Sequence, residues 1–409
     1  MLFRLLNKRL VAILSFFLIS FAVRGLAIAD VTLGDDVFLR ETWRELHGRC
    51  IGILTNRAGV TGTGVPIVDA IEQNAHICVR AIYAPEHGFR ADREAGADVE
   101  SSIDRKTRLP IYALTGANKT VPARLFHNVD VVVVDLQDVG DRAYTYIWTL
   151  AYAMKAAAAS HREIWVLDRP NPLGGDVVEG PVLEPRFASF IGLYPIALRH
   201  GMTIGELARL FNVEFSIGCS LKVISMQGYE RKMMWPDTGL TWVPTSPNIP
   251  TWRSTVLYPA TGLLAAAGFD NGANTQRPFA LVGSPRLDAL LLAEKLERQR
   301  IPGVRFRPAT WRSRAGIWSG KMVRGIELTV TDPRAFRAVS TAVVILTTIR
   351  SMRSAYLREL EPELLDFDWG TNTLRLALQS GASAETIVAR WAAGVDAFRN
   401  RRDPYLLYR

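Results

Sequence analysis

An acid and an imidazole stand side by side in the segment 85–88, Pro-Glu-His-Gly. They follow the apolar run 76–82, which has the composition of a buried strand. Ligands of open α/β sheets bind at the carboxyl ends of strands, so Glu86 and His87 lie where an acid/base pair could act on a substrate. A salt bridge between Glu86 and one of the chain's many arginines is the simpler alternative, and this motif alone leaves both open.

Polar side chains also follow three other apolar runs, at residues 49–55, 130–136 and 164–167. If these runs are parallel strands of one sheet, their polar ends converge on one edge. The side chains expected there are Asn56, Gln137, Asp138, Arg142, Tyr144, Tyr146, Arg169 and Asn171. Paired carboxylates suit glycoside hydrolysis, and arginines suit a ligand that carries its own carboxylate. The tyrosines could stack on a sugar or pack in the core, and only one of them needs to reach the site.

The elements that carry these side chains alternate between short apolar runs and amphipathic stretches. The predicted strands are residues 49–55, 76–82, 109–114, 130–136, 164–167 and 221–226. The predicted helices between them are residues 36–46, 66–73, 122–127, 144–159 and 203–211. This alternation predicts an α/β fold with a Rossmann-like, doubly wound and mostly parallel sheet. In the last helix Thr203 and Glu206 form a capping box, which makes Glu206 structural.

The chain has 409 residues, enough for two domains, and the proline-rich segment 244–250 is the best boundary. We therefore expect a Rossmann-like catalytic domain at residues 30–250 and a smaller α+β auxiliary domain at residues 251–409. In the second domain the pattern predicts helices at 287–298, 333–350 and 384–399, and strands near 303–308 and 325–331.

Residues 1–29 have the parts of a secretory signal peptide. A positively charged start is followed by the apolar run 10–23 and by a small-x-small cleavage site that ends at Ala29. Arg24 interrupts the run, which argues against the alternative of an uncleaved anchor. We predict cleavage after Ala29, a periplasmic or secreted protein, and no stable membrane span after cleavage.

Three cysteines are present, at positions 50, 78 and 219. Cys50 and Cys78 both start predicted strands. If those strands are neighbours, a disulfide is possible in an oxidising compartment, and two buried thiols are an equal alternative.

The formal net charge is +9, and loss of four basic residues with segment 1–29 leaves about +5. Most of the basic residues are arginines, which favour an acidic ligand, and no nucleic-acid-binding signature is present. The segment 59–64 follows the first predicted strand, but its G-x-x-G-x-G spacing makes it a weak nucleotide signal. His87 with Asp92, and Asp138 with Asp141, are better explained by ion pairs than by a metal. We expect neither a cofactor nor a metal.

Several long segments of the chain resemble the exo-β-N-acetylmuramidase family, long catalogued as a domain of unknown function. The matching segments are 52–60 (GILTNRAGV), 84–90 (APEHGFR), 134–150 (VDLQDVGDRAYTYIWTL), 167–175 (LDRPNPLGG), 179–184 (EGPVLE), 198–208 (LRHGMTIGELA), 245–251 (TSPNIPT) and 403–408 (DPYLLY). The resemblance implies a Rossmann-like first domain with an auxiliary second domain. It also implies release of N-acetylmuramic acid from the non-reducing ends of peptidoglycan fragments.

By position, the resemblance makes Glu86 the catalytic acid, with His87 orienting it. The side chains that it places around the substrate include Asn56, Gln137, Arg142, Tyr144 and Arg169, and segment 245–251 adds Asn248. We expect Arg142 or Arg169 to pair with the lactyl carboxylate of the sugar. Whether Asp138, Asp168 or the acetamido group of the substrate completes the reaction is open at this stage.

One segment departs from the family pattern. Members carry Glu-Gly-Thr-Asn and then Ser-Glu-Gly-Arg-Gly-Thr early in the second domain, where this chain has AAAGFDNGANT at residues 265–275. Two acids and an arginine are therefore missing, although Gly272, Pro278 and Phe279 remain. The departure motivates a second hypothesis, a muropeptide-binding or cell-wall-glycan-binding protein without turnover.

Overall fold

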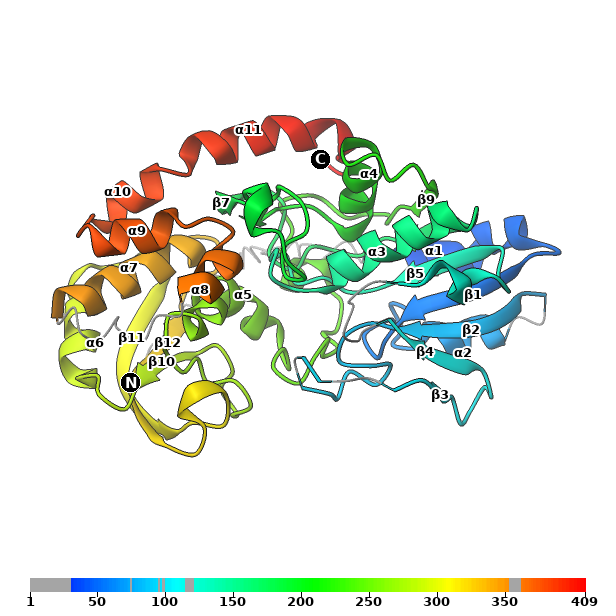
Figure 1. Ribbon diagram of the computed structural model, residues 1–409. Coiled ribbons are helices and arrows are strands. Elements are labelled where there is room, and N and C mark those ends of the chain that lie inside the picture. The colour runs from blue at the N-terminus through cyan, green and yellow to red at the C-terminus, as the bar shows by residue number, and fades with distance from the viewer. Residues whose placement is uncertain (1–30, 74–75, 95, 98–99, 115–120, 353–361) are drawn as a thin grey trace, which may run out of the picture.

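The first domain is built on a seven-stranded sheet with strand order β3-β4-β2-β1-β5-β6-β9 (Figure 1). The computed structural model describes residues 31–409 except 74–75, 95, 98–99, 115–120 and 353–361. The strands, in chain order, are β1 Cys50–Thr55, β2 Cys78–Ala84, β3 Ser102–Ile103, β4 Pro110–Ala113, β5 Val131–Asp135, β6 Glu163–Leu167 and β9 Ser220–Ile224. All neighbours are parallel except β3 and β4. The sheet confirms the predicted mostly parallel α/β fold.

The strand order reverses between β1 and β5. From β1 the chain moves outward to β2 and β4, and then returns to the other side of β1 with β5, β6 and β9. A crevice at the carboxyl ends of two such strands is the usual ligand site of open α/β sheets. In Figure 1 this edge of the sheet faces the second domain.

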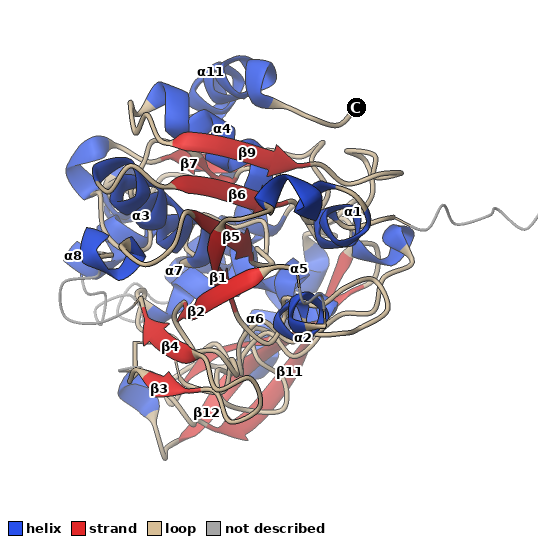
Figure 2. Cartoon of the chain, turned by 90° about the vertical axis from the view of Figure 1, so that its right-hand side faces the viewer, coloured by secondary structure: helices blue, strands red, loops and turns tan. Residues whose placement is uncertain are grey.

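Helices cover both faces of the sheet, as Figure 2 shows. Helices α1 (Gly34–Arg40) and α2 (Ile67–Glu72) pack on one face, and α3 (Tyr146–Ala159) and α4 (Ile204–Glu214) pack on the other. Strand β5, VVVVD, is buried along its whole length because it lies between these two layers. The predicted capping box of Thr203 and Glu206 is confirmed at the start of α4.

The elements of the first domain differ from prediction mainly at their ends. The predicted helix 36–46 is the short helix α1 followed by the 3-10 helix η1, Thr42–Leu46. The predicted helix 122–127 is the 3-10 turn η2, Ala123–Phe126. Further 3-10 turns and a small hairpin are η3 Pro185–Phe187, η4 Trp235–Thr238, β7 Glu179–Val182 and β8 Ala197–Arg199.

The second domain has a three-stranded antiparallel sheet with order β10-β12-β11, covered by helices. Its elements are α5 Trp252–Thr261, η5 Gly262–Ala265, β10 Leu281–Ser284, α6 Ala289–Arg298, β11 Val304–Arg312, η6 Gly316–Trp318, β12 Met322–Val330, α7 Ala338–Met352, α8 Pro362–Trp369, α9 Thr373–Gln379, α10 Ala384–Ala389, α11 Ala392–Arg402 and η8 Asp403–Tyr405. The predicted helix 384–399 is divided into α10 and α11, and α5, β10, α8 and α9 were not predicted. This arrangement is the expected smaller domain of mixed α and β structure.

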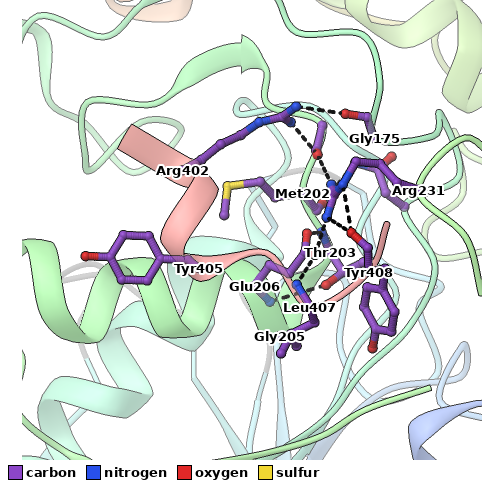
Figure 3. A network of polar contacts seen from close by, with 12 residues as sticks. Gly175, Met202, Thr203, Gly205, Glu206, Arg231, Arg402, Tyr405, Leu407 and Tyr408 are labelled. Atoms are coloured by element: carbon purple, nitrogen blue, oxygen red, sulfur yellow. Dashed lines mark hydrogen bonds and ion pairs between the residues drawn. The ribbon is translucent and has the colours of Figure 1, made fainter. Parts of the chain in front are cut away.

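The chain returns to the first domain at its carboxyl-terminal end. In Figure 1, α11 runs from the second domain to the side of α4, where Val395 and Phe398 pack into the apolar cluster of the first domain. Figure 3 shows the polar contacts that follow: Glu206 accepts hydrogen bonds from the backbone of Leu407, at 2.8 Å, and from Arg231. Residues 392–408 thus bind the two domains together, although our sequence division assigns them to the second.

A disulfide joins Cys50 and Cys78, the paired first residues of β1 and β2, with a Cα–Cα distance of 4.5 Å. Of the two alternatives that the sequence left open, a disulfide or two buried thiols, the structure has the disulfide. Cys219 is a buried free thiol. Within the ranges described, no helix combines the length and apolarity needed to cross a bilayer. The predicted signal peptide, residues 1–29, lies outside those ranges.

Candidate active site

Glu86 lies two residues beyond the end of β2 and is half-buried. Its Oε2 accepts a hydrogen bond from Thr145 Oγ1 at 2.5 Å, and its Oε1 accepts one from the Gly96 backbone at 2.8 Å. These two donors fix the carboxyl group while part of it stays accessible. The predicted acid is therefore positioned at the carboxyl edge of the sheet.

His87 is buried beside Glu86, and its backbone has φ 70°, in the left-handed region that non-glycine residues seldom adopt. Its Nδ1 lies 2.7 Å from the carbonyl oxygen of Arg93. Backbone strain of this kind is concentrated at functional sites. The turn directs His87 toward the loop behind Glu86, which fits the expected orienting role.

Thr145 was not predicted as a site residue. It is the N-cap residue of α3, but its side chain makes no capping hydrogen bond, so the hydroxyl is available to Glu86. Thr145 stands between Tyr144 and Tyr146, two predicted site residues, and from this position it could have been found in the sequence. Because the helix begins at Tyr146, Thr145 and Tyr144 belong to the turn before it.

Tyr144 and Tyr146 both reach Thr245, in the segment between the domains. Tyr144 donates to Thr245 Oγ1 at 2.7 Å, and Tyr146 donates to the Thr245 carbonyl oxygen at 2.5 Å. Asn56 Nδ2 donates to the Tyr146 hydroxyl at 2.5 Å. Burial raises the pKa of both tyrosines, so their hydroxyls remain protonated. The three predicted residues thus hold the segment 245–250 against the sheet edge.

Asn248 joins this segment to the second domain. Its side-chain oxygen accepts from the Asn274 backbone at 2.7 Å, and its Nδ2 donates to Asn274 Oδ1 at 3.0 Å. Asn274 Nδ2 in turn donates to Glu94 Oε1 at 3.2 Å. Glu94 belongs to the same loop as Gly96, the partner of Glu86. Residues 265–275, the altered segment of the second domain, therefore contact the loop that holds the candidate acid.

The altered segment has a well-defined turn of its own. The buried carboxylate of Asp270 accepts from Trp311 Nε1 at 2.6 Å, from the Gly272 backbone at 2.9 Å and from the Ser313 hydroxyl. Asn271 Nδ2 donates to the Gly262 carbonyl oxygen at 3.2 Å. This hydrogen bonding fixes a turn in residues 265–275, the segment that departs from the family pattern.

Arg142 does not have the expected role of a substrate ligand. The side chain is 0% exposed, and Nη1 donates to the carbonyl oxygens of Pro181 and Ile196 at 2.9 and 3.1 Å. Nη2 donates to the carbonyl oxygens of Asp368 and Trp369 at 3.3 and 2.7 Å. Burial lowers the pKa of Arg142 to about 10, which leaves it protonated at neutral pH. The residue fastens the second domain to the first, and we correct the prediction accordingly.

Arg169 is also buried and already paired with two carboxylates. Its Nε donates to Asp135 Oδ1 at 2.5 Å, and its Nη2 donates to Asp35 Oδ2 at 2.7 Å. Burial opposes ionisation of both carboxyl groups and raises the pKa of each. Because its charge is balanced inside the protein, Arg169 is a poor partner for a ligand carboxylate, and this prediction too is corrected. Neither aspartate was selected from the sequence, although Asp135 ends a strand.

Three other predicted residues are buried and hold turns. Gln137 Nε2 donates to the carbonyl oxygens of Asp138 and Pro170 at 2.8 and 2.9 Å. Asp138 Oδ2 accepts from the Gly140 backbone at 2.7 Å and lies 3.3 Å from His200 Nε2. Asn171 bridges the Leu173 backbone and the Met202 carbonyl oxygen at 2.9 Å each. They shape the sheet edge, but Gln137 Oε1 and Asp138 Oδ1 have no partner among the described residues, and Gln137 also lines a cavity at this edge.

Asp168 is fully occupied by partners. Its two oxygens accept from the backbones of Gly205 and Arg169 at 2.7 and 3.0 Å and from the hydroxyls of Tyr408 and Thr203 at 2.6 and 2.8 Å. The side chain is 0% exposed. These contacts exclude Asp168 as the second carboxylate of a hydrolytic pair.

The glycine-rich segment 59–64 borders a cavity of about 240 Å³ that Gln137 and Arg169 also line. Gly59 has no room for a side chain because a Cβ there would overlap Thr55 Oγ1. The backbone N–H of Gly62 is taken by Asp36 Oδ2 at 3.0 Å. Carboxylates in this position disfavour phosphate, which weakens the nucleotide interpretation. In the part of the chain that the structure describes, no group of three or more metal-ligating side chains is assembled.

Two family models together match most of the chain. The model for the N-terminal part of exo-β-N-acetylmuramidase NamZ matches residues 51–253, and the model for its C-terminal part matches residues 256–408. The peptidoglycan β-N-acetylmuramidase NamZ of Bacillus subtilis (strain 168) is 43% identical over 378 residues, which are 92% of this chain and 91% of that protein. These matches confirm the resemblance inferred from the motifs.

Two solved structures of DUF1343 family proteins from Bacteroides fragilis NCTC 9343 have the same fold. One has a TM-score of 0.86 at 30% identity and covers 93% of this chain and 100% of its own. The other has a TM-score of 0.74 at 29% identity, with coverages of 93% and 99%. The similarity therefore extends over both domains.

Proposed function

The chain belongs to the exo-β-N-acetylmuramidase NamZ family, and from this we propose that it is a glycosidase that releases N-acetylmuramic acid from the non-reducing ends of peptidoglycan fragments. Peptidoglycan is the substrate named for the relative from Bacillus subtilis. The observation that carries the proposal is the placement of Glu86, a half-buried carboxyl group at the carboxyl edge of a doubly wound sheet.

In this proposal Glu86 gives its proton to the glycosidic oxygen, and the bond from that oxygen to the anomeric carbon breaks. Water supplies the new hydroxyl group of the sugar, and the proton that this water loses restores the protonated Glu86 over the full cycle. The Thr145 hydroxyl can either donate or accept, so its contact with Oε2 is compatible with both states of the acid. His87 and the Gly96 backbone fix the loop around Glu86. Asn56, Tyr144 and Tyr146 are positioning residues because their contacts hold the segment 245–250 opposite the acid.

Hydrolysis of a chromogenic β-N-acetylmuramide by wild type and by Glu86→Gln tests the proposal. The glutamine has the same shape but no proton to transfer, so kcat should fall about 10³-fold. A matched thermal denaturation should give the same Tm for both proteins, because Glu86 is not a core residue. Equal turnover by the two proteins would refute the role of Glu86.

A second function, binding of muropeptides or wall glycans without turnover, is motivated by the altered residues 265–275. The hydrogen-bonded turn around Asp270 and the Asn248–Asn274 contact support an ordered site and therefore favour the enzyme. Calorimetry with N-acetylmuramic acid-containing fragments, combined with product analysis, separates the two functions. Binding without any released sugar would establish the second one.

We also propose that the protein acts outside the cytoplasm, in the periplasm or after secretion. The Cys50–Cys78 disulfide supports this proposal, because structural disulfides persist mainly in oxidising compartments. N-terminal sequencing of protein recovered from the periplasmic fraction should begin at Asp30, after removal of residues 1–29. Recovery of an uncleaved chain in the membrane fraction would contradict it.

A further inference from the structure

A cavity of about 420 Å³ in the second domain has three arginines and a tryptophan among its eight lining residues. Its walls include Asn274, Thr275, Arg277, Trp311, Arg312 and Arg314. Among the described residues no acid contributes to the lining, so the positive charges converge on a concave surface, where their fields reinforce one another. The volume is within the range of small-molecule binding sites.

The arginines of this cavity differ in their availability. Arg277 pairs with Glu327 at 2.7 Å, and Arg312 donates to the Gly320 carbonyl oxygen at 2.7 Å through one nitrogen. Among the described residues, no carboxylate pairs with Arg312 or Arg314, and both side chains are exposed. At least two guanidinium groups can therefore receive an anion.

A second acid near the cavity, Asp270, is also occupied by other partners. Asp270 is buried behind Trp311, and its oxygens are taken by the indole N–H, the Ser313 hydroxyl and the Gly272 backbone. These contacts fix the indole ring as a rigid wall. Trp311 is only 7% exposed and packs with Leu281, Trp318 and Val323, so the guanidinium groups supply the recognition. They suit a sugar that carries a carboxylate, because a guanidinium group binds both carboxylate oxygens.

The cavity begins where the second domain meets the loop of the candidate acid. Asn274 lines the cavity and at the same time donates to Glu94, eight residues after Glu86. A glycan whose terminal sugar lies at Glu86 therefore has the cavity beside it. Peptidoglycan glycans alternate N-acetylglucosamine with N-acetylmuramic acid. In fragments whose stem peptides have been removed, a second lactyl carboxylate therefore follows the scissile bond at a distance of one intervening sugar.

We propose that this cavity is a subsite for a muramic acid carboxylate of the glycan, the one beyond the scissile bond. The inference rests on the proposed function, since it assigns the remainder of the same substrate. It predicts that Arg312 and Arg314 increase affinity for longer fragments and do not take part in bond cleavage.

The test measures KM for three substrates with wild type and with the double variant Arg312→Ala/Arg314→Ala. An aryl β-N-acetylmuramide and the disaccharide MurNAc-GlcNAc carry one carboxylate, on the terminal sugar, whereas the trisaccharide MurNAc-GlcNAc-MurNAc carries a second one. The KM for the trisaccharide, divided by that for the disaccharide, should rise about tenfold in the variant. Arg305→Ala, on an exposed part of β11 outside the cavity, is the matched control and should keep the wild-type ratio.

The other outcomes are equally informative. If KM rises equally for all three substrates with kcat and Tm unchanged, the arginines bind the carboxylate of the terminal sugar, and the assignment beyond the scissile bond is overturned. Unchanged KM values, or a loss of Tm that lowers every rate, overturn the subsite itself. If wild type cleaves none of the substrates, the proposed function fails, and calorimetry then tests the cavity alone. GlcNAc-MurNAc should bind to wild type and not to the double variant. Any binding of the uncharged di-N-acetylchitobiose should be the same for the two proteins.

Discussion

Glu86 and Asp168 are both carboxylates that follow a parallel strand of the same sheet. Asp168 directly follows β6, is 0% exposed, and accepts four hydrogen bonds. Glu86 follows β2, is half-buried, and accepts two. In the sequence the two look equivalent, since each is a polar residue at the end of an apolar run.

The difference lies in what remains for a substrate. A carboxylate whose lone pairs are all occupied by internal donors stabilises the fold, but it has no free position for proton transfer. Glu86 keeps that capacity because only one donor from the described part of the chain contacts each of its oxygens. Position at the carboxyl edge of a sheet is therefore necessary for a role in the site, while incomplete hydrogen bonding and access decide it.

The largest effect that tests this contrast is on stability. Asp168→Asn replaces one carboxylate oxygen, a hydrogen-bond acceptor, with an NH₂ group that faces two other donors. The hydrogen bonds to that oxygen are lost, so the free energy of unfolding should fall by about 2–3 kcal/mol. Glu86→Gln should change it by less than about 0.5 kcal/mol, as is usual for residues away from the core. Chemical denaturation of the two variants measures both values. Similar losses of stability in the two variants would show that internal hydrogen bonding does not distinguish Asp168 from Glu86.

A smaller effect is expected at the partner of the acid. Thr145→Val removes the hydroxyl that holds Glu86 Oε2 and should lower kcat/KM about tenfold, which corresponds to the loss of one hydrogen bond of about 1.4 kcal/mol. Thr145→Ser keeps the hydroxyl and should restore most of the activity. If serine rescues nothing, the effect of valine comes from packing rather than from the contact with Glu86.

The smallest effect concerns Asp141, a third carboxyl group at this edge. Its Oδ1 accepts from the Ala143 backbone, its Oδ2 has no partner among the described residues, and burial raises its pKa to about 7. The folded protein therefore binds this proton more tightly than the unfolded chain, so the stabilising contribution is lost as pH rises from about 4 to about 7. Asp141→Asn, which imitates the protonated form, should reduce the fall in Tm between pH 5 and pH 8 by a few degrees. An unchanged pH dependence would show that Asp141 is ionised in the fold.

The sheet and the position of the acid could be predicted because their signals are local. The run at β5 is apolar at consecutive positions, and a strand buried on both faces requires that pattern. The second domain was predicted less completely. Helix α5 contains Pro259, which interrupts a helical pattern in the sequence, although tertiary packing accommodates it in the structure.

The partners of the arginines could not be predicted because they are distant in sequence. Arg142 donates to carbonyl oxygens 39 to 227 residues away, and backbone carbonyls have no sequence signature. Arg169 is paired with Asp35, 134 residues earlier. Residue type showed that these arginines bind anionic or polar groups, but only the folded chain shows that those groups are internal.

The contact between Tyr408 and Asp168 also has a consequence for the order of folding. The two residues are 240 positions apart, and at about 5–20 residues per second roughly 12–48 seconds separate their synthesis. In an exported chain the two residues also leave the membrane in that order. Until Tyr408 arrives, the carboxylate of the first domain lacks one of its four donors. The sheet can form early, but its polar core is completed only after the entire second domain has followed.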